Sequence, residues 1–165
     1  MGGTGKTPTA EYLLGVLSDK YNIAILSRGY GRDTEGYREV TVDDSYVDVG
    51  DEPLLLKLKF PDRPVIVCED RVAGIERIRQ EHPEVNLIIM DDGFQHRRVK
   101  AKVNVILIDS TRPIDEDRML PLGRLRDLPS RLGAGHIFIV TKCPKDITPI
   151  QRRLWTKKLR SVAYQ

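Results

Sequence analysis

Five short apolar runs recur along the chain, each of the length of a β-strand. They occupy residues 23–26, 65–68, 85–90, 103–108 and 137–140. All are rich in Val, Ile and Leu without polar alternation, which is typical of parallel strands that are buried on both faces of a sheet. The pattern therefore predicts buried strands in a mostly parallel sheet.

Segments with helical spacing lie between several of these runs. Two apolar stripes stand out, made of Ala10, Leu13, Leu14 and Leu17 and of Val72, Ile75 and Ile78. Because apolar residues three and four apart share one helix face, both stripes predict helices that pack on the sheet. The alternation of strand and helix predicts an α/β fold with three layers, α/β/α.

Two further helices and two long loops are also predicted. Residues 53–60 form a short helix, because the carboxylates of Asp51 and Glu52 favour a helix N-terminus and a proline follows. Residues 149–160 form a helix with a basic face that we expect to be solvated. Residues 29–48 and 109–134 are rich in Gly, Pro, Asp and Arg, and loops of this length are usually functional or disordered.

Composition narrows the class of protein. The 165 residues suit one α/β domain, and 27 basic against 24 acidic residues leave a net charge of only +3. That excess is too small to indicate a nucleic-acid partner, and none is expected. No apolar stretch reaches the roughly 20 residues of a membrane span. Cys68 and Cys143 lie far apart in apolar runs, which predicts reduced thiols.

The first motif opens the chain and leads directly into the first helical stripe. It consists of Gly2, Gly3, Thr4, Gly5, Lys6 and Thr7. In such a loop the glycines turn backbone N–H groups toward phosphate, the lysine reaches the β and γ phosphate oxygens, and the threonine hydroxyl ligates Mg²⁺. The general pattern begins one position before Met1, so we expect a P-loop NTPase-like fold whose first strand is truncated.

The second motif is a pair of carboxylates, Asp91 and Asp92, that follows the apolar run 85–90. Ligands of open α/β sheets bind beyond the carboxyl ends of the strands, so this pair is predicted to face the phosphate loop. The pair resembles a Walker B site. One of the two carboxylates is therefore expected to hold Mg²⁺, directly or through water.

The third motif is Gly50-Asp51-Glu52-Pro53, an acidic pair before the predicted helix. A kinase that acts on a sugar hydroxyl needs a carboxylate to accept its proton. Spacing alone does not assign that role to Asp51. The same residues also suit a helix cap, and without further knowledge the cap is favoured.

Together these motifs resemble the tetraacyldisaccharide 4′-kinase family of lipid A biosynthesis. The resemblance rests on GGTGKTP at 2–8, SRGYG at 27–31, GDEP at 50–53, DR at 70–71, DDGFQH at 91–96 and Leu120-Pro121. It covers nearly the whole chain, and GDEP followed by DDGFQH is its most specific part. One departure inside the chain is Arg124, which stands where the family pattern leads us to expect proline.

The resemblance implies phosphorylation by ATP of the 4′-hydroxyl of an acylated glucosamine disaccharide 1-phosphate. Asp51 would then act as base toward the hydroxyl, with Lys6 and His96 also catalytic. Glu52, Asp91, Asp92 and Thr7 would serve Mg²⁺, and Tyr30, Arg71 and Gln95 would bind substrate. The family acts as a peripheral protein at the cytoplasmic face of the inner membrane.

The resemblance also bears on domain organisation. Residues 1–165 would be the core of an N-terminal lobe, while the strand before the P-loop, a membrane-associating segment and a second lobe would lie outside them. We therefore expect these residues alone to be inactive. Arginines and lysines after residues 92 and 109 are candidate partners of the substrate's 1-phosphate or of lipid headgroups, or else solubilising charge: Arg97, Arg98, Lys100, Lys102, Arg118, Arg124, Arg126 and Arg131.

Other classes of protein remain open at this point. A ParA/MinD-like ATPase switch shares the Gly-Gly-x-Gly-Lys-Thr loop but carries a signature lysine at the position of Met1. A GTPase metallochaperone is suggested by Thr141-Lys142, although Pro144 replaces the aspartate that a guanine site requires. A non-enzymatic scaffold on a P-loop fold is the third alternative, and substrate-dependent ATP turnover would exclude it.

Overall fold

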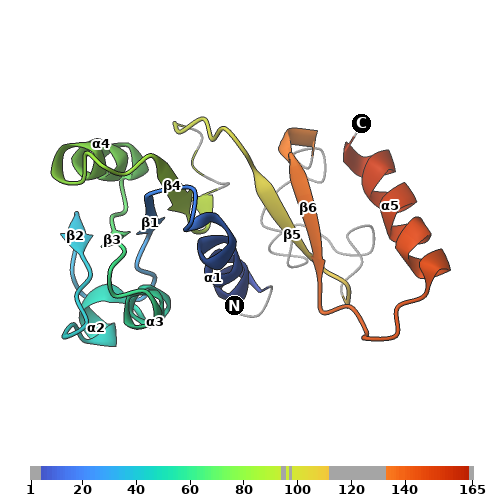
Figure 1. Cartoon of the computed structure of the whole chain (residues 1–165), viewed down its shortest axis with the longest axis horizontal. Coiled ribbons are helices and arrows are strands. Elements are labelled where there is room, and N and C mark those ends of the chain that lie inside the picture. Colours follow the sequence, from blue (N-terminus) through green and yellow to red (C-terminus); the bar gives the residue numbers. More distant parts are fainter. Residues whose placement is uncertain (1–4, 94–95, 97, 112–132, 164–165) are drawn as a thin grey trace. The chain divides into compact units, whose positions relative to one another are not determined.

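The computed structural model describes residues 5–93, 96, 98–111 and 133–163 (Figure 1). It divides into two compact units. The first unit is Lys6–Lys100, and the second contains Gly5 and the described residues from Ala101 onward. Gly2, Gly3, Thr4 and Gln95, like Arg97, Arg118, Arg124, Arg126 and Arg131, lie outside the described residues.

A four-stranded sheet in the order β2-β3-β1-β4 forms the centre of the first unit. Its strands are β1 (Ile23–Ser27), β2 (Arg38–Glu39), β3 (Val65–Val67) and β4 (Leu87–Met90). β1 is parallel to both β3 and β4, whereas β2 is antiparallel to β3. The predicted, mostly parallel sheet is therefore confirmed for this unit.

Helices cover both faces of this sheet. They are α1 (Lys6–Leu17), α2 (Tyr46–Val49), α3 (Asp51–Lys59) and α4 (Arg71–Glu81). Odd-numbered residues of β1 and β3 pack with Leu14 of α1 and Leu56 of α3. Even-numbered residues pack with Ile78 of α4. Because strand side chains alternate between faces, one strand serves two cores, which is the predicted three-layer arrangement.

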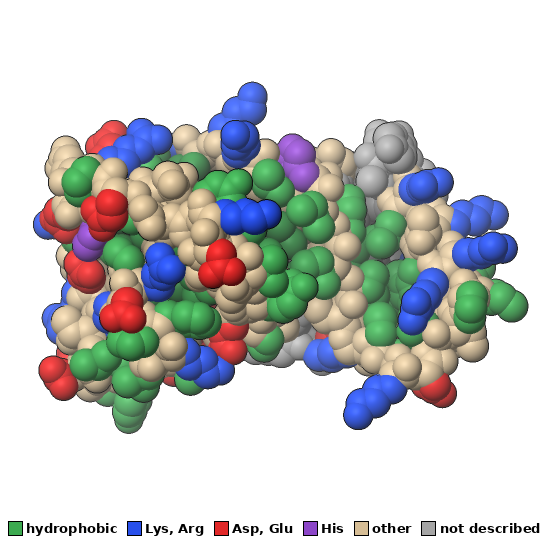
Figure 2. Space-filling view, viewed as in Figure 1, with side chains coloured by type: hydrophobic (Ala, Val, Ile, Leu, Met, Phe, Trp, Pro, Cys, Tyr) green, Lys and Arg blue, Asp and Glu red, His purple; other side chains and the backbone are tan. Residues whose placement is uncertain are grey.

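Two parallel strands, β5 (Val105–Asp109) and β6 (Ile137–Thr141), and the helix α5 (Pro149–Ala163) belong to the second unit. Lys142 Nζ lies 2.7 Å from Asp109 Oδ2, which ties the ends of the two strands together. Figure 2 shows Lys and Arg side chains gathered over α5. Arg152, Arg153, Lys157 and Arg160 are exposed there, as expected for a solvated basic face.

Two expectations from the sequence need correction. Burial is complete only in β1 and β3, whereas the residues of β4 are all partly exposed. The segment 29–48 is not all loop, because it contains β2 and the start of α2.

The sequence did not predict β2 and α2, and the reason in each case is local. β2 has only two residues, both polar, so it has no hydrophobic signature. α2 is a single turn that begins after Ser45, whose hydroxyl accepts a hydrogen bond from the N–H of Asp48. The helix predicted over 53–60 is confirmed as α3, with Asp51 and Glu52 in its first turn. Both cysteines are free thiols, as expected.

Among the described residues, no helix combines the length and apolar character needed to cross a bilayer.

Candidate functional site

Three loops of the first unit meet at one edge of the sheet. Because β1, β3 and β4 are parallel, their carboxyl ends lie at the same edge. Residues 28–36 follow β1, residues 68–70 follow β3 and residues 91–93 follow β4. This is the edge at which open α/β sheets bind ligands.

The lysine of the Gly-Lys-Thr motif reaches this edge. Lys6 is the first residue of α1, and its Nζ lies 3.1 Å from Oδ1 of Asp92, just beyond β4. Asp92 has a φ of 52°, a left-handed conformation that Asp adopts more readily than most residues. The two side chains are 31% and 45% exposed, so their ion pair is screened and can open at little cost.

Two more predicted carboxylates, Glu52 and Asp91, lie close to each other beside this ion pair. Burial, followed by the nearby Asp91 carboxylate, raises the pKa of Glu52, while Lys6 opposes the shift. Burial and the neighbouring negative charge destabilise the ionised form of Glu52, and a bound cation would stabilise it. Oxygen donors are also the ligands that Mg²⁺ prefers, so this pair fits the predicted metal.

Asp51 precedes Glu52 and Thr7 follows Lys6 in the sequence, and both lie at helix starts. Asp51 is exposed, and its Oδ1 accepts a hydrogen bond of 2.9 Å from the N–H of Glu52. Thr7 is the second residue of α1 and is half-buried. Both cap and base remain compatible with the geometry of Asp51, because only one of its oxygens is used in that bond.

Within the described residues, one group of three metal-ligating side chains has its ligand atoms within 4.8 Å of one another, and it lies elsewhere. It consists of Glu39, Glu81 and His82. Glu39 Oε2 already lies 3.1 Å from His82 Nε2, and Glu81 pairs with Arg77. The predicted Mg²⁺ residues thus form a pair rather than a closed cage, which suits an ion that takes one or two protein carboxylates and keeps its other positions for water and phosphate.

The Gly50 turn packs directly on the loop after β1. Gly50 has a φ of 89°, and a Cβ there would lie 3.3 Å from the carbonyl oxygen of Tyr30. Only glycine combines this backbone conformation with such a close approach. The GDEP and SRGYG motifs are therefore neighbours in space, which places Asp51 near the loop that carries Tyr30.

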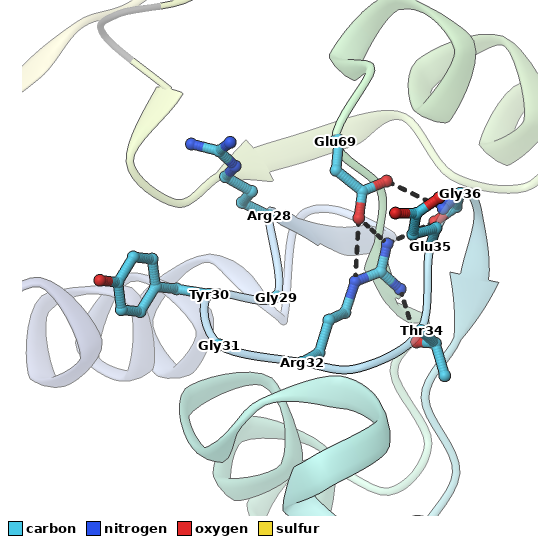
Figure 3. A pocket seen from close by; sticks show the side chains of 9 residues that line it. All are labelled: Arg28, Gly29, Tyr30, Gly31, Arg32, Thr34, Glu35, Gly36 and Glu69. Carbon is cyan, nitrogen blue, oxygen red and sulfur yellow. Dashed lines mark hydrogen bonds and ion pairs between the residues drawn. The ribbon is translucent and has the colours of Figure 1, made fainter.

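A pocket opens within the loop after β1 (Figure 3). Tyr30 and Arg28 point away from the cluster around Glu69, and Tyr30 is 86% exposed. Arg32 is 1% exposed at its side chain and points to Glu69, with which it forms a two-nitrogen ion pair. Arg32 also donates to Thr34 Oγ1 at 3.2 Å and to the carbonyl of Gly36 at 2.6 Å. The guanidinium thus holds the shape of the whole loop.

Replacement of Arg32 by alanine is expected to destabilise the first unit by about 2–4 kcal/mol, because Glu69 keeps only its bond from the Gly36 N–H and two loop acceptors lose a donor. The free energy of unfolding from urea titration measures this change. Arg79→Ala is the matched control, since Arg79 is an exposed arginine of α4. A loss for Arg32→Ala no larger than that of the control would contradict the role given to the guanidinium.

Arg71 and His96 lie at a second pocket beside the loops after β3 and β4, together with Asp70 and Arg98. Arg71 lines this pocket but is only 2% exposed, so most of its side chain lies in the interior. His96 is half-buried, and its N–H bonds the carbonyl of Gly93 at 3.1 Å. Burial, and after it the charges of Arg71 and Arg28, lower the pKa of His96, which keeps the imidazole neutral near pH 7.

Sequence reasoning missed the pair formed by Arg32 and Glu69. The two residues stand 37 positions apart, and no periodicity links them. The surrounding motifs offered the only hint, because Arg32 follows SRGYG and Glu69 precedes Asp70-Arg71.

Comparison with known proteins identifies a family of kinases that resemble this chain. The family model described as tetraacyldisaccharide-1-P 4′-kinase matches residues 1–164. A tetraacyldisaccharide 4′-kinase from Phocaeicola vulgatus is 47% identical over 167 residues, which cover 100% of this chain and 46% of the relative. One from Bacteroides fragilis is 46% identical and is covered to 44%.

The solved structures contain a similar fold. The crystal structure of the apo form of LpxK from Aquifex aeolicus in complex with ATP matches with a TM-score of 0.77 and 30% identity, over 90% of this chain and 49% of that one. The chain thus spans about half the length of the proteins it matches. Neither a ParA/MinD-like switch nor a GTPase metallochaperone gains support from these relatives. On the match across 1–164, the chain belongs to the tetraacyldisaccharide-1-phosphate 4′-kinase family.

Proposed function

We propose that this chain carries the nucleotide-handling half of a kinase. The kinase transfers the γ-phosphoryl group of ATP to the 4′-hydroxyl of a tetraacylated glucosamine disaccharide 1-phosphate. The observation that carries the proposal is the 3.1 Å contact between Lys6 and Asp92, which unites the P-loop lysine with the carboxylates after β4. The family to which the chain belongs supplies the acceptor.

In this reaction the acceptor oxygen forms a bond to the γ-phosphorus as the bond from phosphorus to the bridging oxygen breaks and ADP leaves. The hydroxyl proton passes to a carboxylate, and we assign that role to Asp51, whose second oxygen is not used by the Glu52 N–H. Lys6 exchanges Asp92 for the phosphate oxygens and stabilises the charge that develops on them. Gly2, Gly3, Thr4 and Gly5 provide backbone N–H groups for the phosphates.

Glu52 and Asp91 are the carboxylates that would hold Mg²⁺, with Asp92 and the Thr7 hydroxyl as further ligands. The metal, when bound, supplies charge neutralisation on the β and γ phosphates. His96 is neutral near pH 7. It can therefore donate or accept a hydrogen bond with a polar group in the pocket that it lines, without adding charge. Tyr30 and Gln95 are assigned to the acceptor.

Contact with the acceptor requires a membrane surface, because the acceptor carries four acyl chains. We place the kinase as a peripheral protein at the cytoplasmic face of the inner membrane, where arginines of the loops can meet anionic headgroups. We further propose that residues 1–165 need the remainder of the kinase for transfer, since they span about half the length of the proteins that the chain matches.

The test follows labelled γ-phosphate in detergent micelles with and without the acylated disaccharide. Acceptor-dependent turnover is expected for the full kinase and not for residues 1–165 alone. The full-length Phocaeicola vulgatus relative serves as positive control. ATP hydrolysis that is unaffected by the acceptor would sink the kinase assignment, and turnover by residues 1–165 equal to that of the full kinase would overturn the requirement for the remainder.

A further inference from the structure

Arg71 joins the ends of two strands that are not neighbours in the sheet. Its NH1 donates to the carbonyl of Cys68, just beyond β3, and its NH2 donates at 3.2 Å to the carbonyl of Asp91, just beyond β4. Because β1 lies between β3 and β4, the guanidinium reaches across the carboxyl end of β1. These two hydrogen bonds hold the ends of β3 and β4 in place, and neither is made to a ligand.

The backbone of Asp91 is held at both its N–H and its carbonyl. The N–H of Asp91 donates at 3.1 Å to the carbonyl of Leu26 in β1, while its carbonyl accepts from Arg71. That carbonyl belongs to the peptide that links Asp91 to Asp92, where the chain enters the left-handed conformation. The direction in which both carboxylates leave the strand therefore depends on the Arg71 contact.

Burying the positive charge of Arg71 costs free energy. The side chain is 2% exposed, and burial lowers the pKa of Arg71, although the neighbouring Asp91 and Asp92 charges raise it. Within the described residues, its Nε has no hydrogen-bond partner in the structure. Replacing a buried cation by apolar packing is often neutral or stabilising, so stability alone gives a weak reason for an arginine here.

We propose that Arg71 is a positioning residue and not a substrate ligand. By holding the carbonyl between Asp91 and Asp92, it keeps the Asp91 side chain near Glu52 and the Asp92 side chain against Lys6. The inference rests on the proposed function in one respect, the Mg²⁺ site at these carboxylates. It replaces the substrate-binding role that the family resemblance implied for Arg71.

The experiment measures the binding of a fluorescent ATP analogue to the full kinase over a range of Mg²⁺ concentrations. Arg71→Ala is expected to raise the Mg²⁺ concentration for half-maximal binding about 10- to 100-fold, as loss of a hydrogen bond to a charged group predicts. Arg71→Lys can reach one carbonyl but not both. Its Mg²⁺ concentration for half-maximal binding is expected to lie between the values of the wild type and Arg71→Ala. The KM for the acylated acceptor, measured at saturating Mg²⁺, is expected to stay within about twofold.

Chemical rescue distinguishes positioning from loss of structure. Guanidinium at about 50 mM, too dilute to unfold a domain, is expected to restore the Mg²⁺ dependence of Arg71→Ala, because it can occupy the vacated space and donate to both carbonyls. Urea, a neutral molecule of the same shape, is expected not to do so. The matched control Arg79→Ala should show neither defect nor rescue.

Several results would overturn the proposal. An unchanged Mg²⁺ dependence together with a raised KM for the acceptor would make Arg71 a substrate ligand. If Arg71→Ala does not fold, then Arg71→Lys decides, and a wild-type Mg²⁺ dependence in that variant rejects the role. Failure of the proposed function is separate, because it shows as absent transfer by the wild-type kinase while nucleotide binding still reports on Arg71.

Discussion

Lys6→Ala is expected to lower kcat on the order of 10²-fold or more. In the described part of the chain, the side chain of Lys6 stands at the start of α1 and meets Asp92 at the carboxyl edge of the sheet. A charge fixed at that point stabilises the phosphate oxygens in the transition state more than in the ground state. The KM for ATP is therefore expected to change less than kcat.

Phosphate transfer by the full kinase, followed at saturating ATP, measures this effect. Lys20→Ala is a suitable control, because Lys20 is an exposed lysine shortly after α1. Circular dichroism should show both variants folded, since the Lys6 pair is partly exposed and adds little stability. A kcat of Lys6→Ala within a few-fold of the wild-type value would contradict the assignment of this motif as a P-loop.

Much of the fold could be predicted because it depends on local sequence patterns. Each apolar run gave a strand within a few residues of its predicted bounds, and the two stripes gave α1 and α4. β2 was missed because two polar residues carry no periodicity. The pairing of the strands within each unit was not predicted, because the length of an apolar run does not identify its hydrogen-bonded neighbour.

The candidate site was predicted in part for the same reason. Motif residues at strand ends and helix starts meet because parallel strands end at one edge, so Lys6 and Asp92 could be paired in advance. No comparable rule predicts which residues a long side chain will contact. Arg32 meets Glu69, and Arg71 turns inward to two carbonyls, only because the folded loops bring them there. Their roles required the structure.

The two acidic motifs at this edge are expected to respond differently to amide substitution. Asp91→Asn and Asp92→Asn should raise the Mg²⁺ concentration needed for half-maximal activity, because each removes a charge from the metal site. Asp51→Asn should instead lower kcat by about 10²- to 10⁴-fold at saturating Mg²⁺, since an amide cannot accept the hydroxyl proton. The affinity for ATP should stay nearly unchanged in Asp51→Asn.

Asparagine at position 51 is a favourable test because it keeps the Oδ1 that accepts the Glu52 N–H. The start of α3 is therefore preserved, and a change in rate can be ascribed to the lost base rather than to a lost cap. Asp62→Asn, an exposed aspartate just after α3, is the matched control and should retain wild-type kcat. Recovery of Asp51→Asn turnover at high Mg²⁺ would contradict the role of base, because it would make Asp51 a metal ligand like its neighbour Glu52.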